Sequence, residues 1–233
     1  MTGVTELTGA RGFLRDNGLW TCFTLLFLAT LAGQSVAGLA EQNHQQIADG
    51  LIPVSWAQYV TSSDFATDVA ENWQSEYLQF FLYIVVTVWL VQRGSPESKK
   101  VGDAGLESAR AQRIGRFAGP DSPRPARSSG GLLRLYANSL GLVMGVIFGA
   151  SWLAQSIAGR AAYNDQLLRQ LEDPVSWWGY VGSADFWNRT LQNWQSEFLA
   201  VASMVALSIY LRQRGSPESK PVGTAHGATG IEG

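Results

Sequence analysis

Apolar residues in this chain gather into four runs separated by polar segments, at residues 19–39, 77–91, 140–158 and 198–211. A helix needs roughly 20 apolar residues to cross about 30 Å of hydrocarbon. The first and third runs have about that length. The second and fourth reach it if their helices begin earlier, near Asn72 and Asn193. The pattern therefore predicts an all-α membrane protein with four transmembrane helices.

The second half of the chain resembles the first. Residues 14–102 align without a gap to residues 135–223, 121 positions further on, with 38 identities. Few identities fall in the apolar runs, and most fall in four polar or interfacial segments, which in the first half are residues 34–38, 53–65, 72–76 and 92–99. This predicts two tandem copies of a two-helix unit, constrained most strongly at the helix ends and in the connecting loop.

Basic residues predict the orientation of the chain. Of 17 Lys and Arg residues, only Arg160, Arg169 and Arg189 lie in the loops that join paired runs. Loops that are poor in Lys and Arg face away from the cytoplasm. The N-terminal arm, the central linker and the C-terminal tail are therefore predicted to be cytoplasmic. Both units then enter the membrane in the same direction, which predicts a pseudo-twofold axis along the membrane normal.

The predicted organisation is an N-terminal arm at 1–13, repeat 1 at 14–98, a linker at 99–134, repeat 2 at 135–219 and a tail at 220–233. The linker is basic, rich in Gly, Ser and Pro, and without apolar periodicity, so we expect it and the tail to be disordered. Arg11 and Arg15 before an apolar run also fit a cleaved signal peptide. The recurrence of the same pattern in mid-chain argues against that interpretation.

Two glutamates stand at the predicted membrane boundary. Counted along the helices, Gln34 and Glu76 lie at similar depths, which predicts a hydrogen bond between them and a twin between Gln155 and Glu197. Such bonds contribute about 0.6 to 2 kcal/mol each, enough to fix helix register. An acidic residue in a membrane helix is also a candidate ion or proton site. Both interpretations stay open at this point.

Aromatic residues mark the loop within each unit. Trp56, Tyr59 and Val60 are spaced at i, i+3 and i+4, which predicts a short amphipathic helix lying in the outer interface. Asp64 and Asp185 follow as predicted N-caps of the next long helix. The predicted interfacial aromatic residues are Trp56, Tyr59, Trp73, Trp177, Tyr180 and Trp194.

Residues that could support catalysis or metal binding are few. Cys22 is the single cysteine, and neither His44 nor His226 has a histidine counterpart in the other copy. The sequence shows neither a nucleophile near a base nor a metal-ligand cluster. We therefore expect a protein that is not an enzyme and has no cofactor, no metal and no nucleic-acid partner.

Three strings carry a resemblance to known proteins. Residues 193–199, residues 33–38 and the two tails at 92–99 and 213–220 together resemble a family of bacterial membrane proteins with a domain of unknown function. The resemblance covers most of both repeats. It implies a helical fold and a multi-pass location in the bacterial plasma membrane, and it implies no activity or catalytic residue.

Two functions from different classes follow from these features. The first is an accessory or scaffold protein whose paired helices and outer loops bind lipid, a second copy or another membrane protein. The alternative is a small ion or proton channel or transporter that uses Glu76 and Glu197 around the pseudo-twofold axis.

Overall fold

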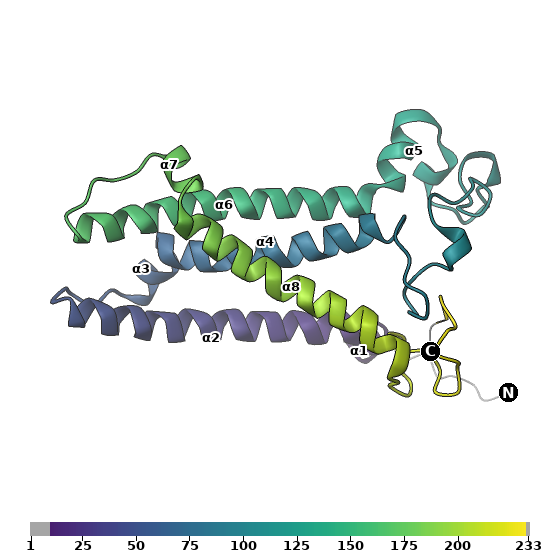
Figure 1. The fold of residues 1–233 in the computed structure, drawn as a ribbon, viewed down its shortest axis with the longest axis horizontal. Helices are drawn as coiled ribbons and strands as arrows, with labels where there is room; N and C mark the ends of the chain where they lie inside the picture. Colours follow the sequence, from purple (N-terminus) through teal and green to yellow (C-terminus); the bar gives the residue numbers. More distant parts are fainter. Residues whose placement is uncertain (1–9, 232–233) are drawn as a thin grey trace. The chain divides into compact units, whose positions relative to one another are not determined.

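The computed structural model describes residues 10–231, and in that range the chain is all-helical, without strands (Figure 1). Its α-helices are α1 (Ala10–Asp16), α2 (Gly18–Ala48), α3 (Trp56–Val60), α4 (Ser63–Val86), α5 (Gly130–Ala137), α6 (Ser139–Arg169), α7 (Trp177–Val181) and α8 (Ala184–Tyr210). Three short 3-10 helices lie between α4 and α5: η1 (Val101–Asp103), η2 (Gly115–Phe117) and η3 (Arg124–Arg127).

Each of the four apolar runs lies largely in a long helix. The helices α2 and α6 have 31 residues each, α4 has 24 and α8 has 27. At 1.5 Å per residue all four are longer than about 30 Å. Among the described residues, α2 and α6 are long and apolar enough to cross a membrane, whereas α4 and α8 do not pass that test. Length and composition therefore fit a membrane span for two of the four predicted helices.

The helix α4 ends before its apolar run does. We expected the helical span to continue to residue 91, but α4 ends at Val86 and the chain continues in turns. The Thr87 hydroxyl donates to the Tyr83 carbonyl at 2.5 Å. Thr hydroxyls that bond back to the preceding turn compete with the helical backbone and favour a bend or an end.

The structure divides into two compact units. The first extends to Ala66 and contains α1, α2, α3 and the first residues of α4. Within it, the short helix α3 packs on α2. The second unit begins at Thr67 and contains the rest of α4 together with α5 to α8. Within it, α7 packs on both α6 and α8.

In the second unit, side chains of α4 lie against two glycines of α6. A methyl group at Gly145 would lie 3.1 Å from the Phe81 ring, and one at Gly141 would lie 3.7 Å from Val85. Glycines spaced by four residues on one helix allow close approach of a neighbouring helix. Residues 141 and 145 have this spacing, and the absence of a side chain at both positions leaves room for Phe81 and Val85.

The distribution of polar and apolar side chains is inverted relative to a soluble protein. Fully buried side chains include Gln74, Gln155 and Thr190, each at 0% exposure. Large apolar side chains on the long helices are exposed, among them Leu19, Phe23, Val146, Ile157, Leu199 and Leu207. Monomeric soluble proteins rarely expose apolar surface on this scale. The surface of these helices is therefore suited to lipid or to protein partners.

The linker and the tail, which we expected to be disordered, have local structure. The linker holds η1 to η3 and the short helix α5, which packs on η3. In the tail the Lys220 side chain is buried, and its ammonium donates to the carbonyls of Gly94 at 2.6 Å and His226 at 2.8 Å. The Gly94 amide donates to Thr229 Oγ1 at 2.8 Å. The tail therefore folds against the segment that follows α4.

Candidate functional site

The loop between α2 and α3 is closed by one asparagine. Asn43 on α2 accepts a hydrogen bond from the Val54 amide at 2.7 Å, and its side-chain amide donates to the Val54 carbonyl at 3.0 Å. This two-way bond mimics a strand pairing and satisfies both backbone groups of Val54. We call residues 43–65 cap 1, because they fold back over the end of α2.

Two aromatic side chains fix α3 against α2 in cap 1. The Trp56 indole donates to Ser35 Oγ at 3.1 Å. Tyr59 is buried at 4% exposure and lies against Gly38, where an added methyl group would overlap the Tyr59 hydroxyl. Ser35 thus accepts a hydrogen bond, whereas Gly38 leaves room for the Tyr59 ring.

The second half builds the same arrangement in cap 2, residues 164–186. Asn164 bonds to the Val175 amide at 2.8 Å and to the Val175 carbonyl at 3.1 Å. The Trp177 indole donates to Ser156 Oγ at 3.0 Å. Tyr180 is fully buried against Gly159, where a methyl group would again overlap its hydroxyl. These contacts join residues that stand 121 positions after their counterparts in cap 1, namely Ser35, Gly38, Asn43, Val54, Trp56 and Tyr59.

Serine, not aspartate, caps the long helices that leave the two caps. Ser62 Oγ accepts from the Phe65 amide, and Ser183 Oγ accepts from the Phe186 amide, each at 3.2 Å. The prediction that Asp64 and Asp185 are the N-caps is therefore wrong. The chain leaves its extended conformation two residues earlier, at a residue whose short hydroxyl reaches the N3 amide. Asp185 lies in the first turn and accepts from the Tyr180 hydroxyl at 3.2 Å.

A group of charged side chains surrounds Arg189 next to cap 2. Arg189 contacts Glu71 at 3.3 Å, Asp185 at 3.6 Å and Asp68 at 3.9 Å. Burial raises the pKa of Glu71, and the neighbouring Arg189 opposes that rise. Burial also raises the pKa of Tyr180, and the adjacent Asp185 carboxylate adds to it. Both α4 and α8 contribute to this group, so it ties the two helices together.

A second set of contacts between α4 and α8 lies one to two turns further along. The Trp194 indole donates to Gln74 Oε1 at 2.7 Å. Glu76 lies close enough to Glu197 for its charge to act on that side chain. We call the facing residues of α4 and α8 between Asp68 and Glu76, and between Arg189 and Glu197, the seam.

The seam adjoins an aromatic cluster between α6 and α8. Trp152 stacks on Phe148 and Phe186, with ring centroids 5.7 and 6.1 Å apart, and lies 5.6 Å from Trp194. Trp194, predicted to be interfacial, is therefore half-buried between helices in the structure. Its counterpart Trp73 is exposed at 41%, and its interfacial location stays a prediction.

The predicted bond between Gln155 and Glu197 is not formed. Gln155 is fully buried, and neither of its side-chain polar atoms has a hydrogen-bond partner. The charge of Glu76 acts on Glu197 instead, since α8 meets α4 along the seam. Gln34 is half-buried in the first unit and Glu76 belongs to the second. The Gln34 to Glu76 bond stays a prediction.

Sequence reasoning missed three features of this site. Arg189 was counted only as a basic loop residue, although its position opposite Asp68 in the alignment signals a charge reversal between the copies. Gln74 is the buried acceptor of the seam, and identity with Gln195 gave no hint of its different surroundings. Gly141 and Gly145 form a small-residue pair whose spacing could have predicted the contact of α6 with α4.

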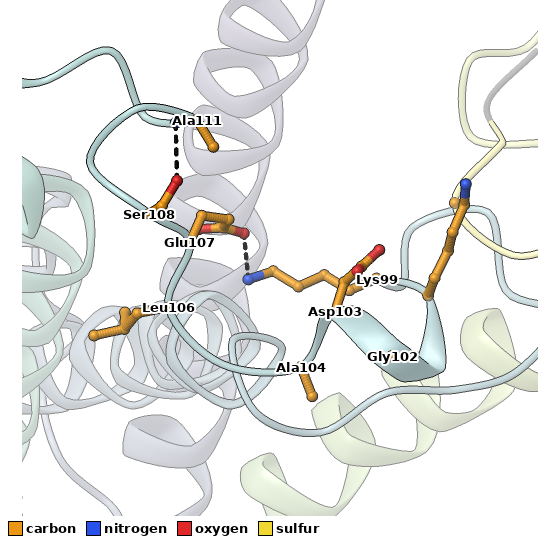
Figure 2. A pocket seen from close by; sticks show the side chains of 10 residues that line it. Lys99, Gly102, Asp103, Ala104, Leu106, Glu107, Ser108 and Ala111 are labelled. Carbon is orange, nitrogen blue, oxygen red and sulfur yellow. Dashed lines mark hydrogen bonds and ion pairs between the residues drawn. The ribbon is translucent and has the colours of Figure 1, made fainter. Parts of the chain in front are cut away.

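A pocket of about 580 Å³ lies largely in the linker, and its lining combines apolar residues with side chains of both charges. Figure 2 shows Lys99 reaching across to Glu107, with nitrogen and oxygen 2.5 Å apart. The same ammonium donates to the Gly105 carbonyl at 2.8 Å. Internal partners therefore occupy this amine, and the pocket presents no concentrated charge for a ligand. The described residues also hold no group of His, Cys, Asp or Glu side chains able to bind a metal ion.

Comparison with known proteins identifies the family. A model of a domain of unknown function, DUF6766, matches residues 10–231. The chain belongs to the DUF6766 family. The match includes both caps, the seam and the linker, so the whole described chain is one family domain. Neither a curated protein nor a solved structure gives a significant match.

Proposed function

We propose that this DUF6766 protein is a four-pass integral membrane protein made of two tandem two-helix repeats. The inverted distribution of side chains supports this, since the exposed apolar surface extends over α8 as well as over α2 and α6. The acidic residues of α4 and α8 lie between the cap and the middle of each helix, as far as Glu76 and Glu197. From Asn72 to the end of α4 and from Asn193 to the end of α8, the helices have 15 and 18 residues, which approach the roughly 20 needed for a span.

The proposed orientation places both caps outside and the linker and tail in the cytoplasm of a bacterial cell. The support is the distribution of basic residues, of which only Arg160, Arg169 and Arg189 fall between the paired apolar runs, in the cap-side halves of α6 and α8. Arg189 is engaged by three carboxylates and Arg169 pairs with Asp165 at 2.8 Å. Local acidic partners therefore offset the charge of two of these three residues.

Within the membrane, the protein acts as a non-enzymatic accessory or scaffold component that associates through its caps. One observation carries this proposal: the same hydrogen-bonded cap is built twice, with six contact residues in common. Each cap is held rigid by its own contacts, yet it leaves large apolar side chains outside. Ile52 is exposed at 86% in cap 1, and Trp178 at 75% in cap 2. Rigid loops that expose apolar anchors suit binding to lipid headgroups or to a protein partner.

Site-specific photo-crosslinking tests the scaffold proposal. A photoreactive amino acid at Trp178 in intact cells should give a discrete protein adduct, whereas the same group at Glu172, an exposed polar position of cap 2, should give little. Discrete adducts at both positions would indicate a broad interface. Adducts only with lipid at Trp178 would show that the cap is a membrane anchor and would contradict the scaffold role.

A second candidate function is a small ion or proton channel. The observation that favours it is the proximity of Glu76 and Glu197, which bring two carboxylates together where α4 and α8 meet. Ion flux into liposomes separates the two functions. We expect the wild type and the double variant Glu76→Gln with Glu197→Gln to give the same background flux at matched protein content. A wild-type current that the double variant loses would establish the channel instead.

A further inference from the structure

The seam pairs residues that occupy equivalent positions in the two copies. Asp68 lies 3.9 Å from Arg189, and the charge of Glu76 acts on Glu197; in each pair the two numbers differ by 121. Gln74 and Trp194 differ by 120. Arg189 and Glu71 differ by 118, so the differences along the seam stay within one helical turn, which means that α4 and α8 run in the same direction and that residues meet close to their own counterparts. This is the geometry of an isologous interface around a twofold axis.

The two copies differ at two charged positions of this seam. The segments 72–76 and 193–197 are identical, but Asp68 is replaced by Arg189 and Glu71 by Gln192. If both copies carried the first sequence, carboxylates would face each other on the axis. Arg189 instead places one cation between Asp68 and Glu71, and the Glu71 side chain is only 15% exposed. The exchange turns a like-charge contact into an ion pair with two acids.

We propose that Arg189 is a specificity residue that makes the first copy pair with the second copy of the same chain. In this view the seam face of α4 is an interaction surface. Two helices compete for it, namely α8 of the same chain and α4 of a second chain. Pairing of α4 with α4 brings Asp68 and Glu71 against their own equivalents, so it is disfavoured as long as Arg189 is available. This inference rests on the proposed tandem-repeat organisation, and it identifies the second repeat of the same chain as the partner of α4.

A charge series tests the proposal with two differently tagged copies of the full chain expressed together. Arg189→Asp should raise co-purification of the two tagged chains roughly fivefold over wild type. A fivefold change corresponds to about 1 kcal/mol, the upper end of the free energy that an exposed ion pair contributes. The double variant Asp68→Arg with Arg189→Asp restores opposite charges and should return co-purification toward the wild-type level. Arg169→Asp removes the exposed pair with Asp165 away from the seam and serves as the matched control.

Two measurements distinguish a role of Arg189 in partner choice from a role in the stability of the folded protein. Thermal unfolding of each purified variant in detergent records loss of stability, which a purely structural ion pair would also show. Unchanged co-purification in Arg189→Asp, or a rise that the double variant does not reverse, would overturn the proposal. Carbonate extraction of the same membranes tests membrane integration separately. An extractable protein would contradict the proposed function, whatever the result of the charge series.

Discussion

At the scale of single residues, the two copies share side chains that contact each other across the caps. Gly38 and Gly159 leave space for tyrosine hydroxyls, and Ser35 and Ser156 accept hydrogen bonds from tryptophans. Packing within each repeat therefore explains why residues 34–38 recur in the second copy. The sequence showed that a constraint was present, but it could not show which loop side chain each residue meets.

We predict that Gly159→Ala destabilises the protein by about 1 to 3 kcal/mol, the usual cost of overpacking. The added methyl group overlaps the Tyr180 hydroxyl, so Tyr180→Phe in the same chain should recover part of the loss. Chemical unfolding in detergent measures both. Gly149→Ala on the same helix is the control, since a methyl group there meets nothing within 4 Å and alanine is the better helix former. Equal losses at 149 and 159 would contradict the packing explanation.

The Gln155 amide gives a prediction of opposite sign. A buried polar group without a hydrogen bond costs about 1 to 3 kcal/mol, and Gln155 makes none. Replacement by methionine, which has a similar length, should therefore raise the free energy of unfolding by about 1 kcal/mol. The same unfolding assay measures it. A clear loss of stability in Gln155→Met would mean that the amide is engaged in the native protein.

At the scale of elements, the periodicity of apolar residues located the four long helices, and the spacing of Trp56, Tyr59 and Val60 located α3. The bounds of α2 and α6, and of α3 and α7, differ by 121 residues at both ends. Apolar patterning predicts such elements because it records which face is buried or exposed to lipid. It did not predict the capping serines, because aspartate and serine are nearly equal as caps and only local geometry chooses between them.

The asparagine bridges of the caps give a prediction at this scale. Asn164→Ala removes two hydrogen bonds to Val175, each of which contributes about 0.5 to 1.5 kcal/mol, so the loss should be about 1 to 3 kcal/mol. Asn43→Ala should cost a similar amount in cap 1. Hydrogen exchange at the Val175 amide should become faster in Asn164→Ala alone. Asn188→Ala, an exposed asparagine on α8, is the control and should leave that exchange unchanged.

At the scale of the whole molecule, the charge distribution and the repeat predict topology, but the pairing of helices needed the structure. The contact of Trp194 with Gln74 joins two side chains that are far apart in sequence, and nothing in either local pattern predicts which helix faces which. We predicted polar contacts within each unit, at Gln155 and Glu197. In the structure the polar contacts join α4 and α8 instead, through Arg189 with Glu71 and Trp194 with Gln74.

The account as a whole requires that both caps lie on the same outer side of a membrane. Cysteine labelling tests this most directly, in a Cys22→Val background that removes the single native cysteine. Ile52→Cys and Asp173→Cys occupy equivalent exposed positions of cap 1 and cap 2, and Asp121→Cys is exposed in the linker. None of the three positions takes part in a cap contact described above.

In intact cells, an impermeant thiol reagent should label the cysteines at 52 and 173 and leave the one at 121 unlabelled until the membrane is permeabilised. Labelling of 52 and 173 from opposite sides would contradict the parallel arrangement of the two units. If only the cysteine at 121 were labelled in intact cells, the orientation would be the opposite of the proposed one. If all three cysteines were labelled only after permeabilisation, the caps would not lie on the outer surface.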